Sequence, residues 1–146
     1  MTTTPLRTSR RPSHEPRRHP VESQALPRGA CADWLERHDE GRLGYGTGRG
    51  PRAVVVGYTV GDGEVLLVLP EYHPATGYLP GAEVTLVVEG RGPEGWTCVE
   101  ASGVARLGDP AEADPLVVGR TDWPDSVVVH VVHVPLTRLE GTLEPA

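Results

Sequence analysis

Residues 51–69 read PRAVVVGYTVGDGEVLLVL, in which two aliphatic runs flank the short sequence Gly61-Asp62-Gly63. Each run has the length and valine content typical of a β-strand. Glycine adopts the positive φ angles that a tight hairpin requires, so the runs are predicted to pair as antiparallel strands. Val54-Val55-Val56 and Leu66-Leu67-Val68 are apolar at successive positions, which indicates strands that are covered on both faces.

Four further segments have strand-like patterning, at residues 42–47, 83–89, 96–107 and 126–134. A second glycine-rich connection, Gly90 to Gly95, predicts that 83–89 and 96–107 also form a hairpin. The predicted inner face of segment 96–107 consists of small apolar residues, which suits a strongly curved sheet: Val99, Ala101, Gly103, Ala105 and Leu107.

The predicted fold class is therefore mainly β: a six-stranded antiparallel split barrel with a short N-terminal helix and minor helical turns. The helix is expected over 29–38, where Cys31, Trp34, Leu35 and His38 share one side, with Gly41 as its C-terminal cap. A further helical turn is expected at 75–79. Strands that are apolar on both faces carry more apolar surface than one small core can cover, so a second subunit is expected to cover the outer face.

The chain divides into a basic tail, 1–28, and a folded domain, 29–146. The tail contains five prolines and six Arg against two Glu, a net charge of +4, and is predicted to be disordered. The domain carries a net charge of −10, which disfavours nucleic-acid binding. No apolar run is long enough for a membrane span or an export signal, so a cytoplasmic location is expected.

The residue types that are absent also exclude several functions. All 14 basic residues are Arg, so a phosphate-binding P-loop lysine and a Schiff-base lysine are both excluded. Ile, Phe and Asn are absent too, and this bias against A/T-rich codons favours a bacterial source. The two cysteines, Cys31 and Cys98, are too few for a disulfide framework and are expected to pack as small apolar residues.

Three short motifs invite a functional reading that their context does not support. His130 and His133 lie three apart in a predicted strand, so they point to opposite faces and no metal site is expected. The run GYGTGRG at 44–50 does not match a dinucleotide fingerprint and no helix follows it, so its glycines are expected to let another backbone or a flat ligand approach. Ser102 lacks a nucleophile elbow, which disfavours a hydrolase.

The order of these elements resembles a known family. The sequence contains L-x-x-H-x-x-GRL at 35–43, PRAVVVGY at 51–58, EVLLVL at 64–69, GW at 95–96 and GVA at 103–105. It ends with Trp123, a valine strand, and VPLTRLEG at 134–141. Over roughly residues 30–143 this pattern resembles the pyridoxamine 5′-phosphate oxidase-like family of FMN-binding split barrels.

The resemblance implies a homodimer with a flavin at the subunit interface, its phosphate held by residues of the second and third strands and the following loop. The chain departs from the family there, because Leu69 and then His73-Pro74 stand where relatives carry a threonine and a lysine-containing pair, and Gly57 stands where relatives often have asparagine. The cofactor-binding residues that the resemblance suggests are Arg52, Tyr58, His73, Thr76 and Trp96.

Two functional hypotheses remain. The first is a small oxidoreductase that binds FMN, or a related flavin or deazaflavin, and acts on a small molecule that the sequence does not name. The second is a cofactor-free split-barrel dimer that serves as a binding or interaction module. Haem or another flat ligand is a lesser alternative.

Overall fold

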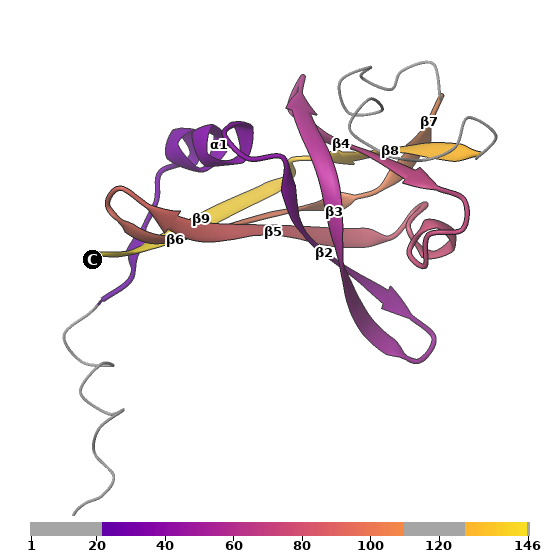
Figure 1. Cartoon of the computed structure of the whole chain (residues 1–146), viewed down its shortest axis with the longest axis horizontal. Coiled ribbons are helices and arrows are strands. Elements are labelled where there is room, and N and C mark those ends of the chain that lie inside the picture. The colour runs from indigo at the N-terminus through magenta and orange to yellow at the C-terminus, as the bar shows by residue number, and fades with distance from the viewer. Residues whose placement is uncertain (1–21, 110–127, 146) are drawn as a thin grey trace, which may run out of the picture.

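The structure is a computed structural model that describes residues 22–109 and 128–145, and the described part is mainly β (Figure 1). Its one α-helix is α1 (Arg28–Glu36), and the short 3-10 helix η4 (Thr76–Tyr78) confirms the helical turn predicted there. The strands are β1 (Gln24–Ala25), β2 (Glu40–Thr47), β3 (Gly50–Gly61), β4 (Glu64–Pro70), β5 (Glu83–Gly92), β6 (Gly95–Val104), β7 (Arg106–Gly108), β8 (Val129–Pro135) and β9 (Arg138–Pro145).

These strands form one open antiparallel sheet in the order β1-β9-β6-β5-β2-β3-β4-β8-β7. The long strand β3 joins its two halves, because residues 50–57 pair with β2 and residues 58–61 pair with β4. The β3–β4 hairpin turns through Asp62 and Gly63, both at positive φ, as predicted. The arrangement is consistent with a split barrel, but the sheet has nine strands rather than the predicted six.

Two of the three extra strands, β7 and β9, come from two features of the chain. The predicted strand 96–107 breaks at Ala105, whose backbone bonds instead to Gly81 and Ala82, so that β7 turns away from β6 and pairs with β8. Leu107 is consequently 47% exposed, and its predicted place on the inner face is wrong. Strand β9 is mostly polar, and only its Leu139 and Leu143 are buried. Its sequence therefore lacks the apolar alternation by which a strand is predicted.

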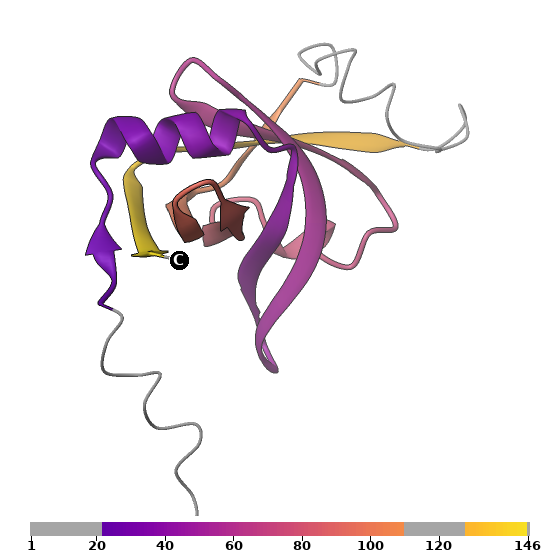
Figure 2. The same cartoon turned by 60° about the vertical axis from the view of Figure 1, so that its left-hand side comes forward.

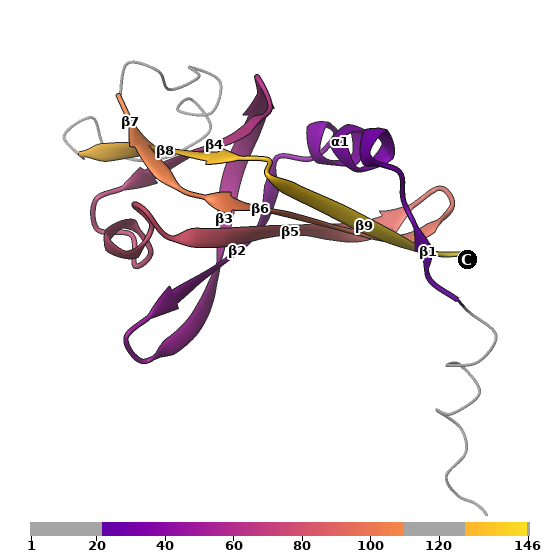
Figure 3. The ribbon, with the colours of Figure 1, turned by 180° about the vertical axis from the view of Figure 1, so that it is seen from behind.

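The break also brings the end of β8 against β6. A Cβ atom on Gly103 of β6 would lie 2.1 Å from the carbonyl oxygen of Pro135, closer than any real contact. Strands that are distant in the order of the sheet therefore meet at this position, as Figure 3 shows from behind. Gly103 is required here because the two backbones approach too closely for a side chain.

Helix α1 packs on β9, β6 and β3 along one side of the sheet (Figure 2). Cys31, Trp34 and Leu35 are buried, as predicted, and the Trp34 indole Nε1 donates a hydrogen bond to the carbonyl oxygen of Val88 at 3.0 Å. The predicted cap at Gly41 is wrong, since the helix ends before Arg37. Gly41 lies in β2, where a Cβ would stand 2.8 Å from the carbonyl oxygen of Val87.

The predicted boundary of the tail needs a correction. Gln24 and Ala25 pair with β9, and the Leu26 side chain packs against the core, so the folded domain already includes residues 24–28. Residues 1–21 of the predicted tail lie outside the described residues. None of the helices within 22–109 and 128–145 is both long and apolar enough to cross a membrane.

The prediction that two strands are covered on both faces holds for one of them. In β4, Leu67, Val68 and Leu69 are all buried. In β3, Val56 is buried but Val55 is 60% exposed, so within one copy of the chain the outer face of β3 is uncovered.

Candidate functional site

A shallow groove of about 460 Å³ lies where the β2–β3 hairpin crosses the start of β5. Figure 1 shows this hairpin extending past the rest of the sheet. Gly44 and Gly46 lie on the face of β2 opposite the buried Leu43 and Tyr45, and a Cβ on Gly46 would meet no atom within 4 Å. Backbone therefore forms the floor of the groove, and a flat ligand could approach it.

The groove has few polar side chains, and most of them are already bonded. The Thr47 hydroxyl donates to the carbonyl oxygen of Gly50 at 2.8 Å, and Glu83 lies 3.8 Å from the Arg138 guanidinium. Arg52 donates one hydrogen bond to the carbonyl oxygen of Pro51, at 3.2 Å. That bond uses one of the five N–H donors of a guanidinium, so Arg52 has donors to offer a ligand.

Two further polar atoms face each other at the edge of the groove. The hydroxyls of Thr85 on β5 and Ser102 on β6 lie 2.9 Å apart across a directly opposed pair. Thr85 lines the groove, whereas Ser102 is 5% exposed. Neither was predicted as a site residue, although strand alternation places both opposite the buried Val84 and Ala101.

A pair of stacked tyrosines connects the hairpin to η4. The rings of Tyr45 and Tyr78 are 5.9 Å apart at an interplanar angle of 29°. Tyr45 is buried and Tyr78 is 50% exposed. Arg52 is the direct cross-strand neighbour of Tyr45, so its side chain leaves the hairpin on the face of Tyr45, opposite Gly44 and Gly46. The turn that contains His73 and Thr76 is thereby brought toward the strand pair that carries Arg52.

Within that turn, the two predicted residues serve the local backbone. The Thr76 hydroxyl donates to the carbonyl oxygen of Pro70 at 2.9 Å, and the His73 Nδ1 accepts the backbone N–H of Ala75 at 3.1 Å. Burial lowers the pKa of His73, which favours its neutral form. A neutral His73 offers no cation to a phosphate, and its role and that of Thr76 in cofactor binding stay predictions.

Tyr58 lies elsewhere. Its ring is 1% exposed and its hydroxyl donates to the carbonyl oxygen of Leu35 at 2.7 Å. Burial and the charge of Asp39 raise the pKa of Tyr58, so the phenol stays protonated. Along β3, Tyr58 is six residues from Arg52, about 20 Å.

Tyr58 lines a second cavity, of about 450 Å³, at the C-terminal end of α1. The polar residues at the helix end that line this cavity are Glu36, Arg37, His38 and Asp39. Two carboxylates and the negative end of a helix dipole disfavour a phosphate there. The groove beside Arg52 is the better candidate for an anionic cofactor.

Trp96 is also remote from the groove. It is 41% exposed and pairs with Arg91 and Glu144 at the hairpin end of β6, six residues from Ser102. That separation is again about 20 Å. Of the five predicted residues, only Arg52 lines the groove. Thr76 belongs to η4, which contacts β2, whereas Tyr58 and Trp96 lie apart from the groove.

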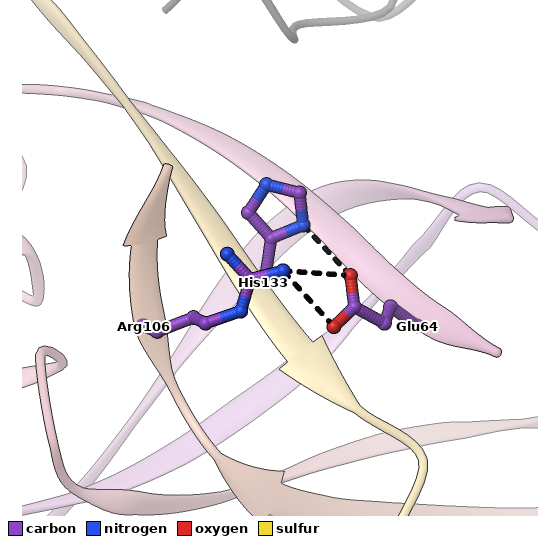
Figure 4. A network of polar contacts seen from close by, with 3 residues as sticks. All are labelled: Glu64, Arg106 and His133. Carbon is purple, nitrogen blue, oxygen red and sulfur yellow. Dashed lines mark hydrogen bonds and ion pairs between the residues drawn. The ribbon is translucent and has the colours of Figure 1, made fainter. Parts of the chain in front are cut away.

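The two histidines of β8 contact different carboxylates. His133 Nδ1 lies 2.9 Å from a carboxylate oxygen of Glu64, which also accepts from Arg106, as Figure 4 shows. His130 Nε2 lies 3.4 Å from Glu71. Among the described residues, no group of three or more His, Cys, Asp or Glu side chains is placed to hold a metal ion.

The cysteines are separate. Cys31 is buried in α1, and Cys98 is half-buried in β6. Burial raises the pKa of both thiols, with the nearby charges of Glu89 and Glu100 adding to the effect at Cys98. A raised pKa disfavours the thiolate that nucleophilic or redox chemistry needs.

No protein-family model and no curated protein matches the sequence. Several solved structures, however, are similar to the structure of this chain. An FAD-binding protein from Mesorhizobium loti has a TM-score of 0.74 at 17% identity, over 86% of this chain and 99% of its own. An FAD-binding protein from Mycobacterium smegmatis has a TM-score of 0.64 at 18% identity, over 84% and 98% of the two chains.

A third similar structure is that of a protein from Corynebacterium glutamicum that is provisionally classed as a pyridoxamine 5′-phosphate oxidase. Its TM-score is 0.68 at 12% identity, over 86% of this chain and 100% of its own. At these identities the likeness establishes the fold. That fold is the one shared by pyridoxamine 5′-phosphate oxidase-like and flavin-binding split-barrel proteins, as the sequence pattern predicted.

Proposed function

We propose that the protein binds a flavin in the groove between β2, β3 and β5, and that it is a homodimer which acts as a small flavin-dependent oxidoreductase. The observation that carries the proposal is the groove that Gly44, Gly46 and Arg52 line, in a fold shared with two proteins described as FAD-binding. A volume of about 460 Å³ lies within the range of ligand pockets.

The residues of the groove fit the two parts of a flavin unequally. The flat ring system suits a floor made of Gly44 and Gly46, because a planar group can approach backbone closely. The phosphate would receive charge-assisted hydrogen bonds from Arg52, while the neutral His73 would add no charge. The donor set thus supports flavin binding and leaves Arg52 as the main phosphate ligand.

A bound flavin supplies the exchange of a hydride with a small-molecule substrate. The chain would contribute orientation, with Gly44 and Gly46 setting the plane of the ring and the Arg52 guanidinium, whose side chain starts from the other face of the hairpin, reaching round the hairpin edge to hold the phosphate. No acid or base of the chain is assigned a proton transfer, because the polar side chains of the groove are hydroxyls, a bonded Glu83 and a guanidinium.

A second copy of the chain would complete the site. The groove is open on one side, and the neighbouring outer face of β3 carries exposed Pro51, Ala53 and Val55, an uncovered apolar strip. Apolar strips of this kind mark subunit interfaces, and a two-fold dimer would cover both strips at once. The dimer would also exclude water from the groove.

The test uses Gly46→Leu, which adds a bulky side chain to the groove lining at a position where the Cβ meets no atom within 4 Å. The matched control is Gly48→Leu, which has the same open surroundings in the same hairpin but does not line the groove. Titration with FMN, FAD and riboflavin, followed by quenching of flavin fluorescence, should show binding by the wild type and Gly48→Leu, and none by Gly46→Leu.

The cofactor-free binding module is the second candidate, favoured by the scarcity of cations at the groove, where Arg52 is the one Arg among the described lining residues. A purified protein that is colourless and fails to quench any of the three flavins would support it and contradict flavin binding. Equal affinity in Gly46→Leu and the wild type would instead place any flavin site elsewhere.

A further inference from the structure

The hydroxyl pair of Thr85 and Ser102 contains a hydrogen that the described structure does not use. Two hydroxyls carry two hydrogens, and a hydrogen bond between them uses one. Across residues 22–109 and 128–145, neither hydroxyl has another hydrogen-bond partner. One hydrogen of the pair is therefore available to a third group.

Burial decides which residue carries the available hydrogen. Ser102 is 5% exposed, whereas Thr85 is half-buried and lines the groove. If Thr85 donated to Ser102, the Ser102 hydrogen would be buried with no acceptor, which is costly. The favoured arrangement has Ser102 donating to Thr85, and the Thr85 hydrogen directed into the groove.

We infer that Thr85 is a specificity-determining residue of the groove, whose hydroxyl donates a hydrogen bond to an acceptor atom on the edge of a planar heteroaromatic ligand. This inference rests on the proposed function for the identity of the ligand, a flavin, and adds the atom that recognises its ring. The Thr47 hydroxyl already donates its hydrogen to Gly50, and the Glu83 carboxylate, which lies beside Arg138, can only accept. Neither group can therefore donate to the ligand in place of Thr85.

The position of Thr85 also fits a ring that lies on the glycine floor. Gly44 is the direct cross-strand neighbour of Thr85, and its Cβ position lies 3.7 Å from the carbonyl oxygen of Thr85. A plane resting on Gly44 and Gly46 therefore presents its edge to the Thr85 hydroxyl. Carbonyl oxygens and unprotonated ring nitrogens are the acceptors that such an edge carries.

The experiment compares flavin affinity across three variants. Thr85→Val keeps the shape and removes the hydroxyl, Thr85→Ser keeps the hydroxyl, and Ser102→Ala removes the partner but leaves the Thr85 hydrogen. We expect Thr85→Val to weaken riboflavin and FMN binding by the same factor, about tenfold, as one lost hydrogen bond implies. Thr85→Ser and Ser102→Ala should stay within about threefold of the wild type.

Because Thr85→Val leaves Ser102 without its acceptor, the double variant Thr85→Val/Ser102→Ala is measured too. It removes both hydroxyls, leaves no buried donor, and should bind as weakly as Thr85→Val. Wild-type affinity in Thr85→Val or in the double variant would overturn the inference while leaving the proposed function intact. A wild type that binds no flavin would overturn the proposed function, and this inference with it.

Discussion

The Glu64 carboxylate of β4 lies 2.9 Å from Nδ1 of His133 in β8, and it also accepts from Arg106 of β7 at 3.2 and 3.3 Å (Figure 4). A carboxylate only accepts, so His133 carries a hydrogen on Nδ1. One acid thus joins three strands on one side of the split barrel. The His133 side chain is only 11% exposed, so its bond to Glu64 should contribute more to stability than the bond of Arg106.

We expect Glu64→Gln to lower the free energy of unfolding by about 1–2 kcal/mol, because a charge-assisted bond to a buried imidazole is replaced by a neutral one. Thermal denaturation should show a decrease in Tm of about 4 °C or more. Arg106→Gln is the control: its side chain is 55% exposed, so its loss should cost less than about 1 kcal/mol. An equal effect of both changes would contradict the role assigned to His133.

The contact of β6 with the end of β8 gives a second prediction. Gly103→Ala places a Cβ 2.1 Å from the carbonyl oxygen of Pro135, so the two strands must separate. We expect a loss of about 1–3 kcal/mol or more, as for other overpacked sites, seen as a lower midpoint in urea unfolding. Gly46→Ala, with no atom near its Cβ, should leave the midpoint unchanged or slightly raised.

The pKa of His73 predicts a pH dependence of stability. Burial lowers this pKa below the ordinary value of 6.5, so the unfolded chain takes up the proton first as the pH falls. The stabilising effect is complete above the unfolded pKa and is lost as the pH falls through the folded one. His73→Asn keeps an acceptor for the Ala75 N–H but does not titrate. Between pH 7 and pH 5 its Tm should therefore fall less than that of the wild type.

The proposed dimer can be tested at Val55. Because Val55 is 60% exposed in one copy, Val55→Glu should leave the monomer folded but bury a charge in the dimer. In sedimentation velocity at micromolar concentration, we expect a dimer for the wild type and a monomer for Val55→Glu. Leu107→Glu, at a similarly exposed aliphatic residue on the far edge of the sheet, should remain a dimer. A monomeric wild type would rule the dimer out.

The fold was largely predictable because strand alternation and turn glycines are local signals. The hairpin at Gly61-Asp62-Gly63 and the buried face of α1 follow from spacing alone. The break at Ala105 could not be predicted, because it depends on hydrogen bonds to residues more than twenty positions away. Strand β9 lacked a signal because its alternating residues are charged or small.

The site was less predictable, because a residue type does not reveal its partner. Tyr58 and Thr76 suited a cofactor by type, yet both hydroxyls donate to backbone carbonyls of the chain itself. Thr85 belongs to no recognisable motif, and the role proposed for it could be inferred only from the Ser102 hydroxyl that lies opposite it. Arg52 alone among the five predicted residues lines the groove.

Arg52 therefore carries the last prediction. Among the described residues, Arg52 is the one cation that lines the groove. It should therefore supply most of the phosphate contact of a bound FMN. Charge-assisted hydrogen bonds contribute about 1.5–3 kcal/mol. Arg52→Ala should then weaken FMN binding on the order of tenfold to a hundredfold, while riboflavin, which has no phosphate, should bind almost as before. Fluorescence titration of both ligands makes the comparison. Equal losses for FMN and riboflavin would mean that Arg52 acts through the fold of the hairpin, and a circular dichroism melt of Arg52→Ala would then show a lowered Tm.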